Sequence, residues 1–335
     1  MKKVLVLVLI VLLTGSMTIF AQGVEETSVE TNKAKTITLA TGDAIGSLRN
    51  LAGWRFKEVL DSHPELNITV NHVEGAVLGS AGQIMDQVVE GSVQLFGNDI
   101  AWLVPYNEDF QPISFGFMFK DVDHMKRYFE SPTFLDVTDT VAAEAGLRAL
   151  EPVPMGSRMF FSTKPLTTAA DFDGLKIRAP GLEMFIKSYE AYGASPTTVA
   201  WNEIFLALKT KLVEAAHGPV ADVIANKWHL AAPIITNAED MYAANCWFVN
   251  DDFWNDLSEE QRAGVLAALK DANEWSVEQN NTKEKEIIAQ MEADGASYST
   301  FADREVLRMN AIKAVKALEA SGKWSSGLVD EIQNQ

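Results

Sequence analysis

Short segments of β-branched residues alternate with amphipathic helical patterns along most of the chain. TITLAT at 36–41 and ITVNHV at 68–73 have strand character, and helical periodicity covers residues 47–61 and 80–91. Further strands are predicted at 93–97, 147–153, 158–163, 175–180, 196–200, 213–219 and 243–249. Most of these segments are separated by enough residues for a crossover helix. The alternation therefore predicts an α/β protein.

One predicted helix is much longer than the others. Ser258 and Gln261 form a capping box, and a helical pattern without proline continues to Glu292 before Gly295 ends it. About 35 residues at 1.5 Å each give about 50 Å, which exceeds the diameter of a small domain. Such a helix is long enough to lie across two lobes. The alternative is a pair of helices broken at Asn280–Asn281, because asparagine lowers helix propensity.

The first residues have the pattern of a secretory signal peptide. Lys2 and Lys3 precede an apolar run at 4–13, and small and polar residues follow as far as Ala21. The run is too short for a membrane span, which needs about 20 apolar residues. We therefore expect residues 1–21 to be cleaved and the folded part to be periplasmic. The alternative is an uncleaved N-terminal anchor, which also places the folded part outside the cytoplasm.

The rest of the chain is too long for one small hydrophobic core. Residues 22–34 read as a polar linker, and about 300 residues follow, which is above the usual size of a single core. We predict two lobes, each built from two segments of the chain. Lobe I comprises residues 35–155 and 244–283. Lobe II comprises residues 156–243 and 284–335.

The chain is strongly acidic, and this limits the possible partners. Its formal net charge of −18 argues against nucleic acid or an anionic membrane surface. It does not argue against a small anionic ligand, because such a ligand responds to the few cations inside its own pocket. We expect a monomer that binds a small molecule.

The sequence lacks the motifs of common enzyme classes. Cys246 is the single cysteine, so no intramolecular disulfide is possible, and the five histidines form no HExxH motif. GxSxG, GxGxxG and GxxxxGK[ST] do not occur where they would matter. We therefore expect no metal, no cofactor and no catalysis. The alternative is a secreted hydrolase or lyase that uses Asp99 or His217 as a base near Arg178.

A single arginine stands at the end of one predicted strand. In GLKIRAPG at 174–181, Arg178 is followed by Pro180 and Gly181, which end the strand. In open α/β sheets the ligand lies beyond the carboxyl ends of the strands, so Arg178 is placed to reach a ligand crevice. The alternative is a surface salt bridge, worth about 0–1 kcal/mol.

Four longer stretches of the sequence together form a recognisable family pattern. They are GAVLGSAGQIMDQVVEGSVQL at 75–95, GSRMFFSTKPLTTAADFDGLKIRAP at 156–180, YGASPTTVAWNEIFLALKTKLVEAAHGP at 192–219 and NDDFWNDLSEEQR at 250–262. Together they resemble the solute-binding proteins of tripartite ATP-independent periplasmic (TRAP) transporters, of the type that binds C4-dicarboxylates or sialic acid. The resemblance implies a two-lobed, type II-like α/β binding protein with a cleft between the lobes and the long helix spanning both.

The resemblance also implies a set of ligand-binding residues. Arg178 falls on the family arginine that clamps the ligand carboxylate with two parallel donors. Arg158 matches a second arginine of the pocket, and Trp201 matches an aromatic residue beside the ligand. Asp99 lies at a position that is acidic in sialic acid-binding members, with a helix N-cap as the alternative role. Asp43 belongs to a loop that closes the pocket from the other lobe.

Two departures from the family pattern bear on the ligand. Gly218 stands where many relatives carry an asparagine that contacts the carboxylate, so His217 or a water replaces that donor, or the glycine makes room for a bulkier ligand. The acidic residue that relatives carry after the LG pair is absent at 80–82. With eight tryptophans in the chain, these changes favour a larger or more apolar organic acid over a small dicarboxylate.

The function implied by the resemblance is transport without chemistry. Two lobes close on an organic acid, and the closed form delivers it to a small and a large integral membrane subunit of a TRAP transporter, which uses an ion gradient rather than ATP. The alternative within the same fold is a periplasmic sensor for a signalling receptor. The identity of the acid stays open among small dicarboxylates, sugar acids and aromatic acids.

Overall fold

The structure, a computed structural model, describes residues 32–335. The predicted signal peptide and nearly all of the predicted linker lie outside these residues. The strands are β1 (Lys35–Thr41), β2 (Ile68–Glu74), β3 (Leu95–Asp99), β4 (Leu147–Ser162), β5 (Lys176–Ala179), β6 (Ser195–Thr198), β7 (Ala215–Pro219), β8 (Ile234–Asn237), β9 (Tyr242–Asn250) and β10 (Ser297–Thr300). The α-helices are α1 (Leu48–Asp61), α2 (Ala81–Val89), α3 (Val122–Phe129), α4 (Pro132–Ala145), α5 (Glu183–Ala191), α6 (Ile204–Lys209), α7 (Val220–Ala225), α8 (Asp251–Asn255), α9 (Glu259–Ala293), α10 (Arg304–Ala320) and α11 (Leu328–Gln333).

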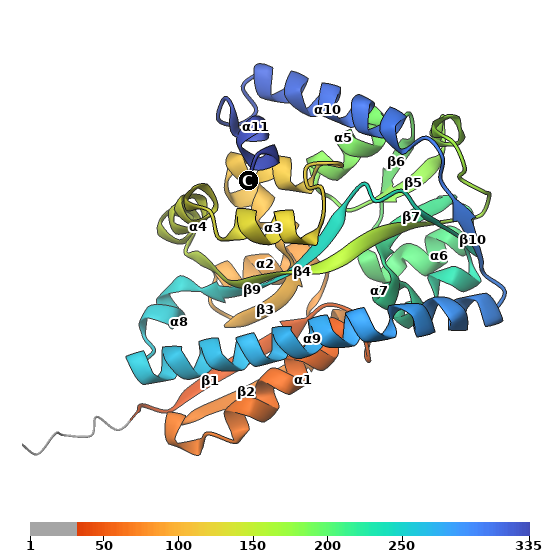
Figure 1. The fold of residues 1–335 in the computed structure, drawn as a ribbon. Coiled ribbons are helices and arrows are strands. Elements are labelled where there is room, and N and C mark those ends of the chain that lie inside the picture. Colours follow the sequence, from red (N-terminus) through yellow and green to blue (C-terminus); the bar gives the residue numbers. More distant parts are fainter. Residues whose placement is uncertain (1–31) are drawn as a thin grey trace, which may run out of the picture. The chain divides into compact units, whose positions relative to one another are not determined.

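The strands join in one mixed sheet with the order β2-β1-β3-β9-β4-β7-β5-β6, and β8 and β10 extend it beside β4. The outer strands pair in parallel, whereas β9 and β4 are antiparallel to their neighbours. β4 pairs with β9 from Leu147 to Ser157 and with β7 from Arg158 to Ser162. Figure 1 shows β4 crossing from the group of β1, β2 and β3 to the group of β5, β6 and β7. The predicted α/β fold is confirmed.

Most predicted strands are present, but two of them form a single strand. The segments predicted at 147–153 and 158–163 are both part of β4. Two prolines and a glycine lie in this part of the strand, which absorbs them through shifts of register after Leu150 and after Pro154. Glu151 and Gly156 have φ angles of 47° and 93°, which locates the irregular backbone. Sequence analysis missed β8 and β10.

The long predicted helix is confirmed as one continuous element, α9, with the expected capping box of Ser258 and Gln261. The alternative break at Asn280–Asn281 is wrong, because the buried Asn280 amide donates to the Met155 carbonyl at 2.9 Å and so fits inside the helix. Helix α9 contacts α1 at one end and β10 at the other, with β4 and α7 between (Figure 1). Within residues 32–335, no helix is both long and apolar enough to span a membrane.

Apolar clusters hold these layers together. One packs α1 and α9 against the sheet through Phe56, Trp247 and Leu269. Another surrounds Trp228 beside β7 and β8. The largest continues from the β3 side to the β5 side of the sheet, and it includes both Phe96 and Phe160. The lobe boundaries stay a prediction.

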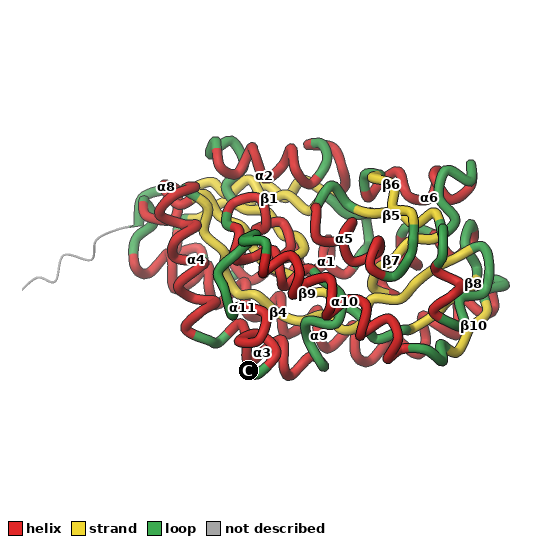
Figure 2. Tube along the Cα trace, turned by 90° about the horizontal axis from the view of Figure 1, so that it is seen from above, coloured by secondary structure: helices red, strands yellow, loops and turns green. Residues whose placement is uncertain are grey.

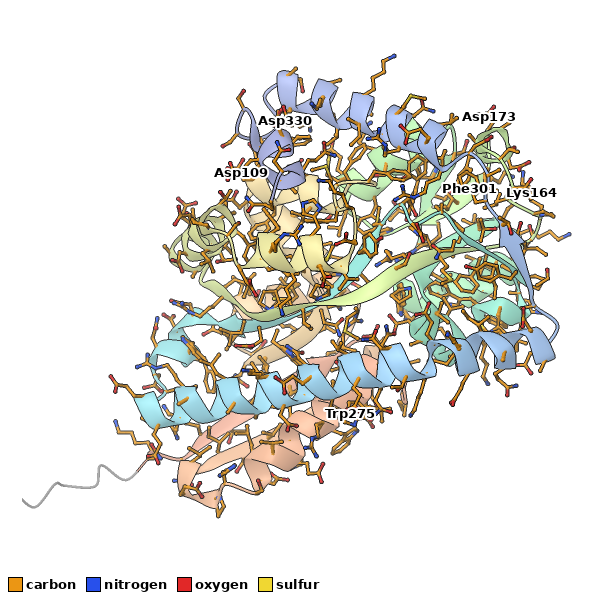
Figure 3. All side chains as sticks on the ribbon, viewed as in Figure 1. Asp109, Lys164, Asp173, Trp275, Phe301 and Asp330 are labelled. Carbon is orange, nitrogen blue, oxygen red and sulfur yellow. The ribbon has the colours of Figure 1, made fainter. Side chains whose placement is uncertain are left out.

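The C-terminal segment contacts elements that are far apart in the sequence. Helix α10 packs on α5, and Lys323 pairs with Glu183 of that helix at 3.0 Å. Beyond α10, the Ser325 amide donates to Asp109 at 2.7 Å, a contact whose acceptor is labelled in Figure 3. Figure 2 shows α10 and α11 from above, between α5 and α3. The segment therefore links α5 to the short helix Glu108–Ser114 that carries Asp109.

Buried asparagines of α9 generate a first prediction. Asn273 donates to the Glu151 carbonyl at 2.8 Å and accepts from the Trp247 indole at 2.9 Å. Asn273→Ala leaves both groups without a partner, so we expect the free energy of unfolding to fall by about 2–4 kcal/mol in urea titrations followed by circular dichroism. Asn281→Ala, the same change at an exposed site of α9, is the control, and it should leave the free energy of unfolding unchanged or slightly raised because alanine has the higher helix propensity. Equal effects of the two changes would contradict this account of Asn273.

Candidate functional site

A cavity of about 390 Å³ lies at the carboxyl ends of β1, β3, β5 and β6. This is the position at which open α/β sheets bind their ligands. Its walls come from residues of both predicted lobes. They include Gly42, Asp43, Arg49, Asp99, Trp102, Arg158, Arg178, Phe185, Val199, Trp201 and Asp222. The cavity volume falls in the range of small-molecule sites, about 300–1,000 Å³.

Arg178 lies on β5 and is only 5% exposed. Its Nε donates to the Val199 carbonyl at 2.9 Å, and its guanidinium lies 5.5 Å from the Trp201 ring. Among residues 32–335, the two terminal nitrogens of Arg178 have no hydrogen-bond partner. Burial, with a contribution from Arg158, lowers the pKa of Arg178 to about 9. The side chain is thus still charged at neutral pH, held at its base, and open to an anion at its tip.

Arg158 also lines the cavity, but protein groups already hold it. It lies on β4 and donates to Asp99 at 3.0 Å and to the His217 carbonyl at 3.2 Å. Asp99 accepts from the Ala101 amide at 3.0 Å as well, so it caps the helix Ile100–Tyr106. The N-cap role of Asp99 is therefore present, and its second oxygen fixes Arg158. Both oxygens are engaged, which leaves Asp99 poorly placed to act as a base.

Asp43 reaches the cavity from the loop after β1, and its partner is a residue that sequence analysis missed. Arg49 of α1 donates to Asp43 at 2.5 Å and to the Asn245 side chain at 2.8 and 3.1 Å. Burial alone would lower the pKa of Arg49, but the carboxylates of Asp43 and Asp222 raise it above its ordinary value. Arg49 is therefore a charged residue of the cavity wall, held in place by Asp43 and Asn245.

Asp222 is the second residue that sequence analysis missed. It lies on α7, directly after β7, and is 6% exposed. Within the described part of the chain its carboxylate has no hydrogen-bond or ion-pair partner, although it lines the cavity. Burial raises its pKa to about 6 against the attraction of Arg49. A sequence signal did exist, since an aspartate inside the apolar run PVADVIA is a buried charge in need of a partner.

Trp201 forms part of the cavity wall, whereas Gly218 lies behind it. A Cβ atom on Gly218 would lie 3.0 Å from the Trp228 ring and 3.3 Å from the Trp201 ring. The glycine therefore makes room for two packed tryptophans, whose ring centroids are 4.6 Å apart, and not for a bulkier ligand. The expectation that Gly218 contacts the ligand is not supported by its position.

His217 is likewise turned away from the cavity. Its ring is 1% exposed, stacks on Phe160 at 4.1 Å, and lies 3.2 Å from the Tyr189 hydroxyl and 3.3 Å from Asp240. Only its carbonyl acts on the site, by accepting from Arg158. The His217 side chain therefore does not line the cavity where the family pattern would place the asparagine donor, and its ligand role stays a prediction. The structure thus brings Arg178, Arg158, Trp201, Asp99 and Asp43 together, and leaves Gly218 and His217 behind them.

A family profile decides the class of the protein. The family described as bacterial extracellular solute-binding protein, family 7, matches residues 49–320. The chain belongs to this family. The sialic acid-binding periplasmic protein SiaP of Vibrio cholerae is 24% identical over 83% of this chain and 86% of its own length. The ectoine-binding periplasmic protein TeaA of Halomonas elongata is 24% identical over 86% of either chain.

Solved structures agree with this assignment. A TRAP periplasmic solute-binding protein of Roseobacter denitrificans with bound β-D-glucuronate is 25% identical and has a TM-score of 0.83, covering 89% of this chain and 99% of its own. The two-lobed α/β fold and the TRAP resemblance predicted from the motifs are confirmed. This solute-binding protein is a member of a binding family rather than an enzyme family.

The unpartnered carboxylate generates a second prediction, on stability. A rise in pKa from 3.8 to about 6 means that folding favours the neutral acid, at a cost of roughly 3 kcal/mol at neutral pH. Below about pH 4 Asp222 is protonated in both the folded and the unfolded state and does not lower the free energy of unfolding. The free energy of unfolding falls as the pH rises toward 6 and stays lower above it. Asp222→Asn should raise the unfolding free energy of the ligand-free protein by about 1–3 kcal/mol at pH 7.5 and by much less at pH 4.

The control for this measurement is Asp86→Asn, which removes an exposed carboxylate of α2. Urea titrations of both variants and the parent at the two pH values give the comparison. A gain for Asp222→Asn that is the same at pH 4 and pH 7.5 would contradict the buried-charge explanation, because a pH-independent gain reports packing alone.

Proposed function

We propose that this solute-binding protein captures an organic acid by its carboxylate and delivers it to a TRAP membrane transporter. The observation that carries the proposal is Arg178, whose buried guanidinium lines the cavity and whose terminal nitrogens have no partner in the described part of the chain. A buried cation without a counter-ion is costly unless a ligand supplies one. A planar carboxylate matches the two parallel donors of a guanidinium.

The ligands named for the compared proteins support a carboxylate. Sialic acid, ectoine and glucuronate differ in size and in ring, yet each carries a carboxylate group. Their common group is therefore the one that Arg178 is suited to bind. The parts of the ligand other than its carboxylate would contact the other residues of the cavity wall.

The surrounding residues have supporting roles in this proposal. Arg158 lies close enough to Arg178 to affect its ionisation, and its link to Asp99 keeps it from collapsing onto the carboxylate site. Trp201 offers a rigid face for an apolar part of the solute, beside the guanidinium. Asp43 lies on the opposite predicted lobe, so closure brings it toward the solute.

Capture requires the two predicted lobes to close on the solute. β4 and β9 connect the lobes, and residues of both lobes line the cavity, so a hinge in these strands would bury the solute from two sides. In the proposed cycle, the closed protein docks on the small and large membrane subunits of the transporter. The protein acts as a periplasmic monomer after export by the signal peptide at residues 1–21.

Isothermal titration with the ligand-stripped protein tests the clamp. Suitable probes are D-glucuronate, N-acetylneuraminate and ectoine, together with short mono- and dicarboxylates. For the best ligand, we expect Arg178→Ala to weaken binding on the order of 100-fold or more, because two charge-assisted hydrogen bonds are lost. Arg178→Lys should recover only part of the loss, since lysine cannot form the bidentate pair.

Arg127→Ala is the matched control, because Arg127 is an exposed arginine of α3. It should bind like the parent protein. Undiminished binding by Arg178→Ala, or a best ligand that has no carboxylate, would refute the proposed clamp.

A further inference from the structure

The charged residues of the cavity wall are paired unevenly. The wall carries three arginines and three aspartates. Arg49 pairs with Asp43, and Arg158 pairs with Asp99. Arg178 and Asp222 are left, and neither has an ion-pair partner among residues 32–335. The empty site thus presents one free positive group and one free negative group.

The two free groups do not neutralise each other. The charges that act most on Asp222 are those of Arg49 and Asp43, and the charge that acts most on Arg178 among the site arginines and aspartates is that of Arg158. Arg49 attracts Asp222, but its three nitrogens donate to Asp43 and Asn245, and Asp222 is not among the charges that act on Arg178. Asp222 and Arg178 therefore occupy separate places on the wall, and each can meet a different end of one solute.

We propose that the solute is zwitterionic, with a cationic nitrogen bound by Asp222 in addition to the carboxylate bound by Arg178. This inference rests on the proposed carboxylate clamp. A buried carboxylate that faces a cavity without a partner needs a donor from the ligand, as the free arginine needs an acceptor. An ammonium or amidinium group supplies both the charge and the hydrogen bonds.

Lobe closure makes the pairing more important. Expulsion of water raises the cost of any charge that stays unpaired. A solute with a carboxylate alone would neutralise Arg178 and leave Asp222 buried beside Asp43 and Asp99. A second carboxylate would add repulsion to that cost. A zwitterion satisfies both free groups and leaves the cavity wall without an unpaired charge, and its uncharged middle can lie against Trp102 and Trp201.

Matched ligands and an isosteric variant test the proposal. The ligands form series in which only one end differs: 4-aminobutanoate, 4-hydroxybutanoate and glutarate, with ectoine and D-glucuronate as larger probes. Titrations at pH 7.5 use the parent protein, Asp222→Asn, Arg178→Ala and the exposed control Asp86→Asn. We expect zwitterions to bind tightest to the parent. Asp222→Asn should weaken them at least about 30-fold and leave or improve the binding of pure anions.

The outcomes separate this inference from the proposed function. If pure anions bind the parent as well as zwitterions do and Asp222→Asn does not weaken zwitterions, the zwitterion inference fails, while sensitivity to Arg178→Ala keeps the clamp. If Arg178→Ala binds every ligand undiminished, the clamp itself fails. If no zwitterion in the series binds up to 10 mM, the inference is rejected. A wild-type response from Asp86→Asn confirms that any effect belongs to the cavity.

Discussion

The antiparallel pairing of β4 with β9 is the constraint on which the rest of the structure depends. β4 changes partner along its length, from β9 to β7, and so belongs to both halves of the sheet. The change takes place at Arg158, directly after the irregular backbone at Glu151 and Gly156. Helix α9 stabilises this stretch, because Asn273 and Asn280 bind carbonyls that the irregular ladder leaves free. Arg158 therefore lines the cavity from β4, the strand that joins the two halves of the sheet.

The charged side chains of the cavity wall are of two kinds: some are held in ion pairs within the protein, and others are not. The fold is able to pair buried charges, as Arg49 with Asp43 and Arg158 with Asp99 show. Within residues 32–335, Arg178 and Asp222 have no ion-pair partner although both are more than nine-tenths buried. Each lowers the stability of the empty protein, which is the usual relation between a binding site and folding. The fixed pairs hold the wall in place, and the unpaired groups are the ones to which we assign ligand binding.

Sequence reasoning found the features that local patterns determine. β1 and β2 follow from their β-branched runs, α9 from its cap and unbroken periodicity, and Arg178 from its place at a strand end. It failed where distant residues decide the outcome. β8 and β10 are short and pair through segments more than 60 residues apart. Gly218 is explained by the packing of Trp228, and Asp222 is significant because the fold places it in the cavity wall while Arg49 pairs with Asp43.

Net charge and local charge act on the solute over different distances. The chain carries a formal charge of −18, which opposes the approach of an anion at long range. Salt screens that field within about 8 Å at physiological ionic strength, so it has little influence inside a cleft. There Arg178 and Asp222 line the wall, and in the proposed binding mode their hydrogen bonds to the solute decide what stays bound. An acidic protein can therefore bind a carboxylate. Under the zwitterion proposal, the same solute also carries a cationic group that pairs with Asp222.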